Sequence, residues 1–190
     1  MKLDDIKKLK GQITPKEVEK LAELASKCPH NALIVEIGSY TGKSSTAIAY
    51  GMPKDATLLC IDPWLQLHRK TEQGYESIET VKTFSDRTSK YHPRVIQVIG
   101  FPLQVAKFIN QPIDMLSIDS VKKYEQIKEI WDCWLPKVKK GGIVASHDYL
   151  PDPNHEQYYE GVVKVIHEQV KPITENHEHI DFTFSGTIKK

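Results

Sequence analysis

Two short segments carry side chains that could bind a cation or move a proton: Asp119 and Lys122 in one, His147 and Asp148 in the other. Carboxylate and imidazole groups are ligands of divalent cations, and an amine or imidazole nitrogen can take a proton from a hydroxyl group. Each segment directly follows an apolar run of strand length. Neighbouring parallel strands end at one shared crevice where ligands bind, so we expect these four side chains to lie together.

A glycine-containing segment, Val35–Ser44, follows an earlier apolar run and could approach a ligand with its backbone. A Walker A loop needs four residues between its glycines, whereas Gly38 and Gly42 enclose three, so the following Lys43 and Ser44 do not indicate a nucleotide triphosphatase. Tyr40 occupies the second glycine position of the dinucleotide fingerprint, which weakens a nicotinamide or flavin interpretation.

Asp62 ends the next apolar run. A carboxylate about 20 residues past a glycine turn, at the C-terminal end of a strand, is placed to accept hydrogen bonds from ribose hydroxyls. A simple turn residue at a strand end is the alternative.

The elements that would position these groups alternate along the chain. Apolar runs of strand length alternate with longer segments of helical spacing, which predicts βαβ units and a parallel sheet buried on both faces. The expected strands are Leu33–Ile37, Thr57–Ile61, Val95–Ile99, Asp114–Ile118 and Gly142–Ser146. We therefore expect an α/β fold: a Rossmann-like, doubly wound, mostly parallel sheet with an antiparallel C-terminal edge strand and helices on both faces.

Helix signals support this pattern. Thr14, Pro15 and Glu17 form a capping box with a proline at the first helical position, which predicts a helix to about Ser26. Apolar spacing predicts further helices at Ser45–Gly51, Tyr124–Val138 and around Val162–Val170. Glycines 141 and 142 should end the helix at Tyr124–Val138 and begin the next strand. In the tail, Ile180–Ile188 should form antiparallel edge strands around a turn at Ser185-Gly186.

Composition bounds the class of protein. The 190 residues suit a single domain, with helices in residues 1–30 and the core in 31–190, and the net charge of +1 indicates no nucleic-acid partner. Apolar runs fall far short of the roughly 20 residues that cross a membrane, and the charged N-terminus has no signal-peptide pattern. Three scattered cysteines without a CxxC pair favour a reducing compartment, so we expect a cytoplasmic protein. The oligomeric state stays open, a homodimer included.

Four motifs occur in order: EIGSYTGKSS, CIDPW, DMLSIDSVKKYE and KKGGIVASHDY. From about Asn31 to the end, the chain resembles class I S-adenosylmethionine-dependent methyltransferases, namely the methyltransferase domain 24 group, with features of the catechol O-methyltransferase-like enzymes. The resemblance implies a set of residues that bind S-adenosylmethionine. Glu36 would lie near the amino group, Gly38, Tyr40 and Gly42 along the methionine portion, and Asp62 at the ribose. The full expected set is Glu36, Gly38, Ser39, Tyr40, Gly42, Ser44, Asp62, Pro63, Trp64, Gly100, Phe101 and Asp119.

The same resemblance implies a divalent metal at Asp119, His147 and Asp148, with Lys122 as the base. The domain 24 group usually has a histidine where Lys122 stands, so the chain departs from it there and resembles the metal-dependent branch. His147 is a poor ligand for magnesium but suits manganese, iron, cobalt or zinc. Two alternatives stay open: a metal-free site in which His147 is the base, and a solvated Lys122 at a helix start. With the metal and the base placed in this way, we expect Lys122, His147 and Asp148 to be catalytic.

Two segments at strand ends could cover the crevice: Trp64–Tyr75, with Gln66, His68, Arg69 and Lys70, and Tyr149–Gly161, with His155, Tyr158 and Tyr159. Their polarity favours a small polar acceptor such as a sugar, polyol or phenol. The expected function is methyl transfer from S-adenosylmethionine to an oxygen atom of that acceptor. The alternatives are an S-adenosylmethionine-binding protein with different chemistry and an NAD-dependent oxidoreductase.

Overall fold

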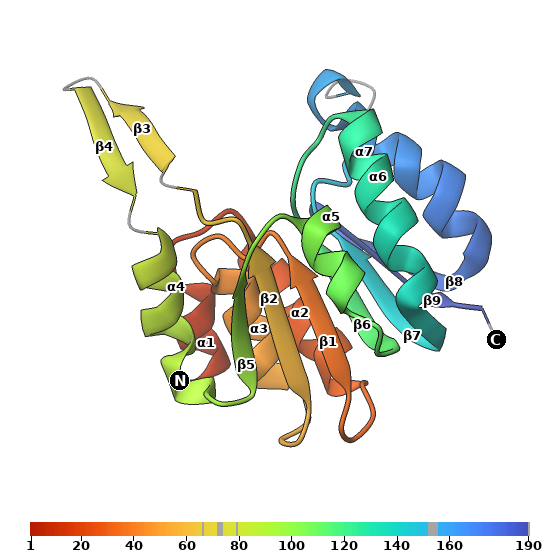
Figure 1. Ribbon diagram of the computed structural model, residues 1–190, viewed down its shortest axis with the longest axis horizontal. Helices are drawn as coiled ribbons and strands as arrows, with labels where there is room; N and C mark the ends of the chain where they lie inside the picture. Colours follow the sequence, from red (N-terminus) through yellow and green to blue (C-terminus); the bar gives the residue numbers. More distant parts are fainter. Residues whose placement is uncertain (66, 72–73, 79, 152–155, 190) are drawn as a thin grey trace.

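The protein has a central seven-stranded sheet with helices on both faces (Figure 1). The computed structural model describes residues 1–65, 67–71, 74–78, 80–151 and 156–189, without the side chains of 67–71, 74–78 and 156–158. The strand order is β5-β2-β1-β6-β7-β9-β8. The first five strands run parallel, and β9 pairs antiparallel with both of its neighbours, β7 and β8. The predicted fold class is therefore confirmed. The strands are β1 (Leu33–Ile37), β2 (Thr57–Asp62), β5 (Val95–Ile99), β6 (Ile113–Ile118), β7 (Val138–Ser146), β8 (Thr174–Ile180) and β9 (Thr183–Ile188).

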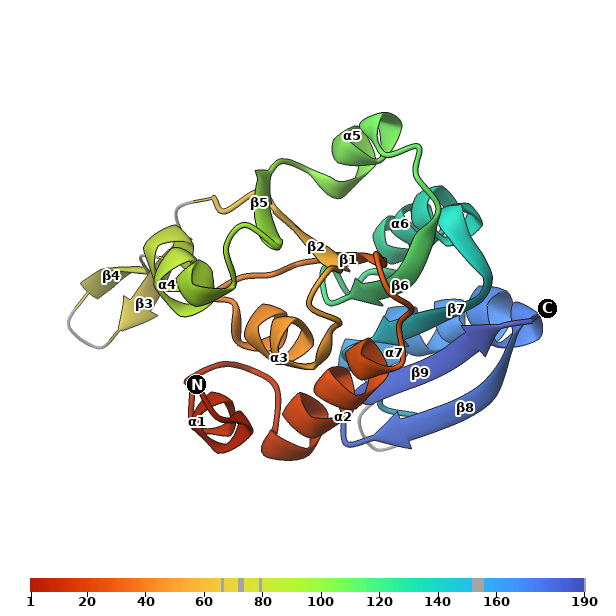
Figure 2. The ribbon, with the colours of Figure 1, turned by 90° about the horizontal axis from the view of Figure 1, so that it is seen from below.

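Alternating strand residues build two apolar cores, one on each face of the sheet. Ile34 and Leu58 pack with helices α1–α4, whereas Val35 and Ile61 pack with α5–α7. Figure 2 shows the same division into three layers. The helices are α1 (Leu3–Lys7), α2 (Pro15–Ser26), α3 (Lys43–Gly51), α4 (Thr80–Thr88), α5 (Pro102–Val105), α6 (Tyr124–Trp134) and α7 (Glu156–Val165), the last continued by a π-helical turn.

Helix α2 begins as its sequence predicts. The Thr14 side chain accepts a hydrogen bond from Glu17 N, and the Glu17 side chain accepts one from Thr14 N. The helix packs against α3 below the sheet and reaches the antiparallel strands β8 and β9 (Figure 2). It is thus close to the C-terminal ends of the parallel strands.

The predicted boundary between α6 and β7 was wrong. The helix ends at Trp134 and a 3₁₀ turn with Pro136 follows, so the strand begins at Val138 and contains both glycines. Gly141 has a left-handed backbone (φ 75°), and the register with β6 shifts between the Val138 and Ile143 pairs. A bulge inside the strand therefore explains the glycine that sequence reasoning interpreted as a helix end.

The predicted turn at Ser185-Gly186 was also wrong. Both residues lie inside β9, and the turn falls at Asp181 and Phe182, where Asp181 has a φ of 50°. A Cβ atom on Gly186 would come within 3.1 Å of the His177 ring, so this glycine serves close cross-strand packing instead of a turn.

The two expected cover segments differ from the long loops predicted. The first contains an antiparallel ribbon, β3 (Leu67–Thr71) and β4 (Gly74–Ile78), which projects away from the sheet (Figure 1). The second enters α7 at Glu156. Gln66 and His155 lie outside the residues that the structure describes. The side chains of His68, Arg69, Lys70 and Tyr158 also lie outside it, whereas that of Tyr159 is described. No helix among the described residues is long and apolar enough to cross a membrane.

Candidate active site

Backbone hydrogen bonds continue past the ends of the central strands and place the candidate residues side by side. Gly38 N donates to Ile61 O at 2.8 Å, Asp119 N to Ile37 O at 2.8 Å, and His147 N to Ile118 O at 3.0 Å. The strand order reverses between β1 and β6. Such a switch point is where ligands bind in open α/β sheets.

The glycine loop, residues 38–42, packs directly against the end of β6. Gly38 has a φ of 88°, and a Cβ atom there would lie 1.6 Å from the carbonyl oxygen of Asp119. Gly42 has a φ of 80° and begins α3, and a Cβ atom there would lie 2.8 Å from the Phe84 ring. Both positions therefore require glycine for conformation and for close approach.

Asp62 ties the glycine loop to the end of β2. Its carboxylate accepts hydrogen bonds from Tyr40 N at 2.9 Å and Trp64 N at 2.7 Å. Tyr40 and Trp64 both have left-handed backbones, with φ of 45° and 39°. A carboxylate has about four lone-pair positions, so two backbone donors leave Asp62 able to accept from ribose hydroxyls as well.

Trp64 is buried against the glycine loop. Its ring packs against Phe84 at 4.8 Å between centroids, and its indole N–H donates to Tyr40 O at 2.7 Å. Phe101, by contrast, is 50% exposed, and the adjacent Gly100 N donates to Asp62 O at 3.1 Å. The Phe101 ring is thus an exposed apolar surface close to the end of β2, while Pro63 is half-buried between Asp62 and Trp64.

Glu36 is a buried carboxylate under the glycine loop. Its Oε2 atom accepts hydrogen bonds from Ser39 Oγ at 2.6 Å and from Ser45 Oγ. Its Oε1 atom is buried without a hydrogen-bond partner among the described residues. Burial raises the pKa of Glu36, although the serine hydroxyls oppose the shift. A donor such as an ammonium group would satisfy the free oxygen.

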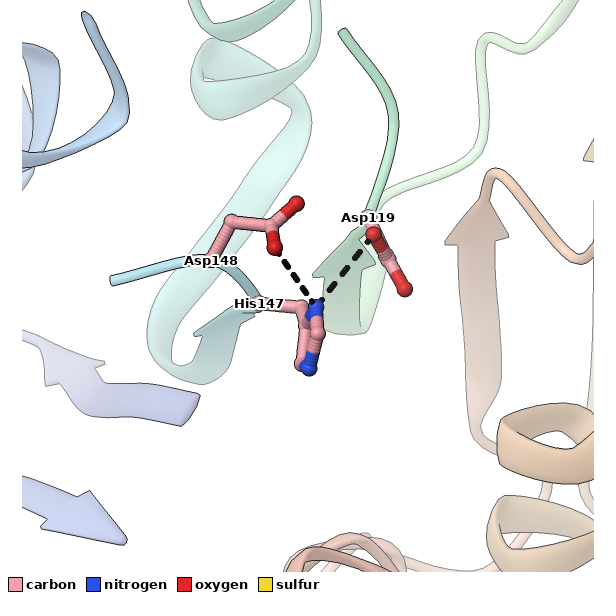
Figure 3. Close-up of side chains that lie close together, drawn as sticks. All are labelled: Asp119, His147 and Asp148. Carbon is pink, nitrogen blue, oxygen red and sulfur yellow. Dashed lines mark ion pairs between the residues drawn. The ribbon is translucent and has the colours of Figure 1, made fainter. Parts of the chain in front are cut away.

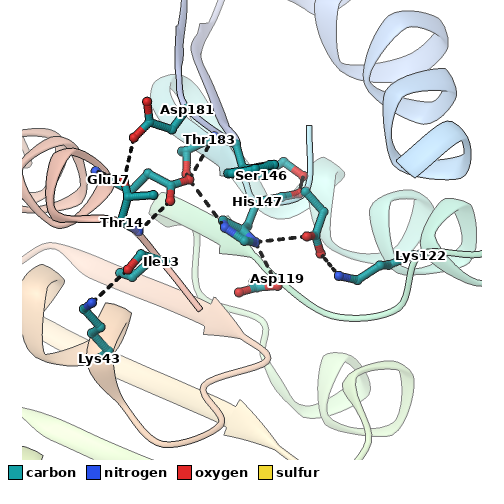
Figure 4. A network of polar contacts seen from close by, with 12 residues as sticks. Ile13, Thr14, Glu17, Lys43, Asp119, Lys122, Ser146, His147, Asp181 and Thr183 are labelled. Carbon is teal, nitrogen blue, oxygen red and sulfur yellow. Dashed lines mark hydrogen bonds and ion pairs between the residues drawn. The ribbon is translucent and has the colours of Figure 1, made fainter. Parts of the chain in front are cut away.

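The segment between α1 and α2 covers the glycine loop. The buried Lys43 side chain donates from Nζ to Ile13 O at 2.8 Å (Figure 4). A cavity of about 30 Å³ lies between Gly11–Ile13 and the loop, and Ser44 and Asp119 also line it. Lys43 therefore holds this covering segment against the glycine loop.

Asp119, His147 and Asp148 converge at the ends of β6 and β7 (Figure 3). His147 Nδ1 lies 3.3 Å from Asp148 Oδ1 and 3.5 Å from Asp119 Oδ1, and one ligand atom from each residue can be chosen so that all lie within 4.8 Å. Successive strand residues normally point to opposite faces. The left-handed backbone of Asp148 (φ 61°) breaks this alternation and lets both neighbours face Asp119.

Lys122 lies at the edge of the same cluster. Its Nζ atom is 2.8 Å from Asp148 Oδ2, and its side chain is 28% exposed. The amine also lies over the Tyr159 ring, 5.4 Å from the centroid. Lys122 thus contacts the predicted metal ligand and remains accessible to a small molecule.

Glu17 is a member of this cluster that sequence reasoning missed. Its Oε1 atom lies 3.4 Å from His147 Nε2, and the carboxylate is fully buried (Figure 4). Burial would raise the pKa of Glu17, but His147 and hydrogen bonds from Thr14 and Thr183 outweigh it and lower the pKa. The capping box was a signal for this residue, but it predicted only a helix start.

The carboxylates keep His147 protonated. Burial would lower the pKa of His147, but Asp119, Asp148 and Glu17 together raise it to about 12. Burial likewise would raise the pKa of Asp148, while His147 and Lys122 lower it. Three carboxylates and two cationic side chains leave the cluster with one excess negative charge, so a further cation would be attracted to it.

Comparison with known proteins decides between the nucleotide-binding classes that share this sheet. The family model Methyltransf_24, described as a methyltransferase domain, matches residues 35–149, more than half of the chain. The chain belongs to this methyltransferase family. This match covers the glycine loop, Asp62 and the strand-end residues 119–148. The protein is therefore an S-adenosylmethionine-dependent methyltransferase of class I.

Solved structures with the same fold differ in their acceptors. TomG, an O-methyltransferase from Streptomyces achromogenes solved with SAM, is 19% identical with a TM-score of 0.70, over 94% of this chain and 82% of that one. An O-methyltransferase from Bacillus cereus solved with SAH is 13% identical with a TM-score of 0.70, over 99% and 90%. An rRNA methylase from Streptococcus thermophilus is 12% identical with a TM-score of 0.63, over 96% and 99%. At these identities the likeness establishes the fold alone.

The candidate metal ligands of this methyltransferase fit a divalent transition metal. Two carboxylates and one imidazole suit manganese, iron, cobalt or zinc better than magnesium. Both ring nitrogens of His147 are buried, and neither makes a well-aligned hydrogen bond within the described residues. A cation at Asp119 and Asp148 would occupy the place of the Nδ1 proton, so cation and proton compete there.

Proposed function

We propose that the protein transfers a methyl group from S-adenosylmethionine to an oxygen atom of a small polar acceptor, with a divalent cation at Asp119, His147 and Asp148. One observation carries the proposal: Asp119 lines the cavity at the glycine loop and also belongs to the His147 cluster. A methyl donor on the loop and an acceptor on the cation would therefore meet at one residue. Proximity and orientation are large contributions to the rate of such a transfer.

We assign the donor to the glycine-loop side. Backbone groups of Gly38, Tyr40 and Gly42, together with Ser39 and Ser44, would hold the methionine portion, and the free Oε1 atom of Glu36 would accept from its amino group. Asp62 would accept from the ribose and Phe101 would contact the adenine. The 30 Å³ cavity is far below the roughly 300 Å³ or more of a small-molecule site, so Gly11–Ile13 would move when the donor enters there.

We assign the acceptor to the His147 side. A bound divalent cation lowers the pKa of an acceptor hydroxyl and orients its oxygen. Lys122 is the candidate to accept the hydroxyl proton at Nζ, because it is accessible beside Asp148. His147 is the weaker candidate for this step, since both ring nitrogens face carboxylates. We expect a small acceptor such as a phenol, polyol or sugar.

Calorimetric titration of chelator-treated protein tests the donor and the cation separately. We expect micromolar binding of S-adenosylmethionine and S-adenosylhomocysteine, no binding of NAD, and tighter binding of manganese than of magnesium. Failure of both sulfur compounds to bind would refute S-adenosylmethionine as the methyl donor. Full activity after chelation, with no metal by elemental analysis, would leave a metal-free transferase in which the cation plays no part.

The variant Asp148→Asn tests the acceptor side. Loss of a charged ligand should lower methylation on the order of 100-fold while donor affinity stays within about twofold. Release of S-adenosylhomocysteine against a panel of phenols, polyols and sugars measures activity whatever the acceptor. Asp132→Asn, at an exposed position of α6, is the control. Equal losses of donor affinity and activity in Asp148→Asn would indicate a structural role instead.

A further inference from the structure

Glu17 has two tasks in the fold. As the third residue of α2 it caps the helix, with Oε2 accepting from Thr14 N at 2.8 Å. Its Oε1 atom accepts from Thr183 Oγ1 at 2.7 Å, at the start of β9, and from Phe182 N at 3.2 Å, in the turn before it. Both carboxylate oxygens are therefore held, and turning the group away would leave buried donors unpaired.

The held Oε1 atom faces one nitrogen of His147. It lies 3.4 Å from Nε2, while the other ring nitrogen, Nδ1, lies 3.3 Å from Asp148 Oδ1 and 3.5 Å from Asp119 Oδ1 (Figure 4). The ring is 10% exposed and so has little access to water as a competing partner. Glu17 and the pair of aspartates thus lie on opposite edges of the same ring.

We propose that Glu17 is a positioning residue that keeps the proton of His147 on Nε2 and directs the Nδ1 lone pair toward the cation at Asp119 and Asp148. This inference rests on the cation of the proposed function. A carboxylate that accepts the N–H of a metal-binding histidine fixes its tautomer and ring orientation, and its loss typically costs 10- to 100-fold in metal affinity. Helix α2 therefore contributes to the site through His147, outside the residues that the family match covers.

The variant Glu17→Gln tests the contact of the carboxylate with His147. Glutamine also satisfies a capping box, so the start of α2 is kept, while the carboxylate facing His147 is lost. An amide N–H directed at Nε2 would favour the tautomer with the proton on Nδ1. Titration of the full-length, chelator-treated chain with manganese alone, followed by the electron paramagnetic resonance signal of free manganese, should give a 10- to 100-fold weaker affinity than wild type.

Thr14→Ala is the matched control. It removes the other side chain of the same capping box but keeps the Thr14 backbone N–H that binds Glu17. It should lower the melting temperature and leave manganese affinity within about twofold of wild type. Glu17→Gln should likewise leave S-adenosylmethionine affinity within about twofold, which also shows that this variant is folded. Manganese binding by Glu17→Gln as tight as by wild type would overturn the role of Glu17.

A spectroscopic readout tests the tautomer directly. In zinc-loaded wild-type protein, nitrogen–proton correlation spectra of the imidazole rings should show the His147 proton on Nε2, with the ring assigned by its absence in His147→Gln. A proton on Nδ1 would overturn the inference even if zinc is bound. Wild-type protein that binds S-adenosylmethionine but neither manganese nor zinc would instead refute the cation of the proposed function, and the role of Glu17 with it.

Discussion

The glycine-loop side and the His147 side of the site meet at Asp119 but are built differently. On the glycine-loop side, most groups come from residues 36–64, and most contacts are made by backbone amides and glycines. On the His147 side, charged side chains come from residues as distant as Glu17 and Asp148, and they hold one another in a buried cluster. Shape therefore dominates one side and charge the other, so substitutions should separate the two.

The largest effect is expected where the two sides touch. In Gly38→Ala, the new Cβ atom would lie 1.6 Å from the Asp119 carbonyl oxygen, and both the loop and β6 would have to shift. We expect at least about 2 kcal/mol of lost stability in urea unfolding, with weaker donor and manganese binding. Gly141→Ala is the control, because Gly141 has a similar φ of 75° but open space around it. Equal losses in both variants would mean that backbone strain, and not contact with Asp119, explains the effect.

A smaller and one-sided effect is expected for Asp62→Asn. An asparagine can accept one of the Tyr40 and Trp64 amide hydrogens but not both, so the glycine loop should loosen. We expect donor binding to weaken by about tenfold, about 1.4 kcal/mol, with manganese affinity unchanged. Asp55→Asn, exposed at the opposite end of β2, is the calorimetric control. Weakened manganese binding in Asp62→Asn would show that the two sides are not separable.

The smallest effect concerns stability against pH. Because burial raises the pKa of Glu36 above its unfolded value, the folded state binds more protons, and the contribution of Glu36 to stability is lost as pH rises through the folded pKa. Glu36→Gln should therefore be more stable than wild type by on the order of 1 kcal/mol at pH 8, and the advantage should vanish at pH 4. Urea unfolding at both values measures it, with exposed Glu129→Gln as control. A constant difference at both pH values would contradict this account.

The same contrast explains what the sequence could predict. Buried parallel strands produce continuous apolar runs, so β1 and β5 were predicted with the bounds found and β2 and β6 to within one residue. The capping box of α2 was confirmed because its hydrogen bonds span only three residues. The errors fall where tertiary contacts override local signals: the bulge at Gly141 and the packing of Gly186 between strands were interpreted as a helix end and a turn.

The prediction of site residues was limited in the same way, because tertiary contacts cannot be read from local patterns. The strand-end pattern was enough to bring Asp119, His147 and Asp148 together, because the topology of a parallel sheet determines which strand ends meet. It could not find Glu17, whose capping role already explained the residue and whose contact with His147 depends on how α2 packs against β9. The packing of the Trp64 indole on Phe84 was not predicted either.

The hydrogen bond between Glu17 and Thr183 has a consequence for the newly made chain. Glu17 precedes every methyltransferase motif in the sequence, whereas Phe182 and Thr183 follow all of them and are therefore synthesised later. Until β9 inserts beside β7, the carboxylate of Glu17 lacks the two donors that hold it. A nascent chain that already contains all four motifs would thus lack a fixed Glu17 carboxylate until β9 pairs with β7.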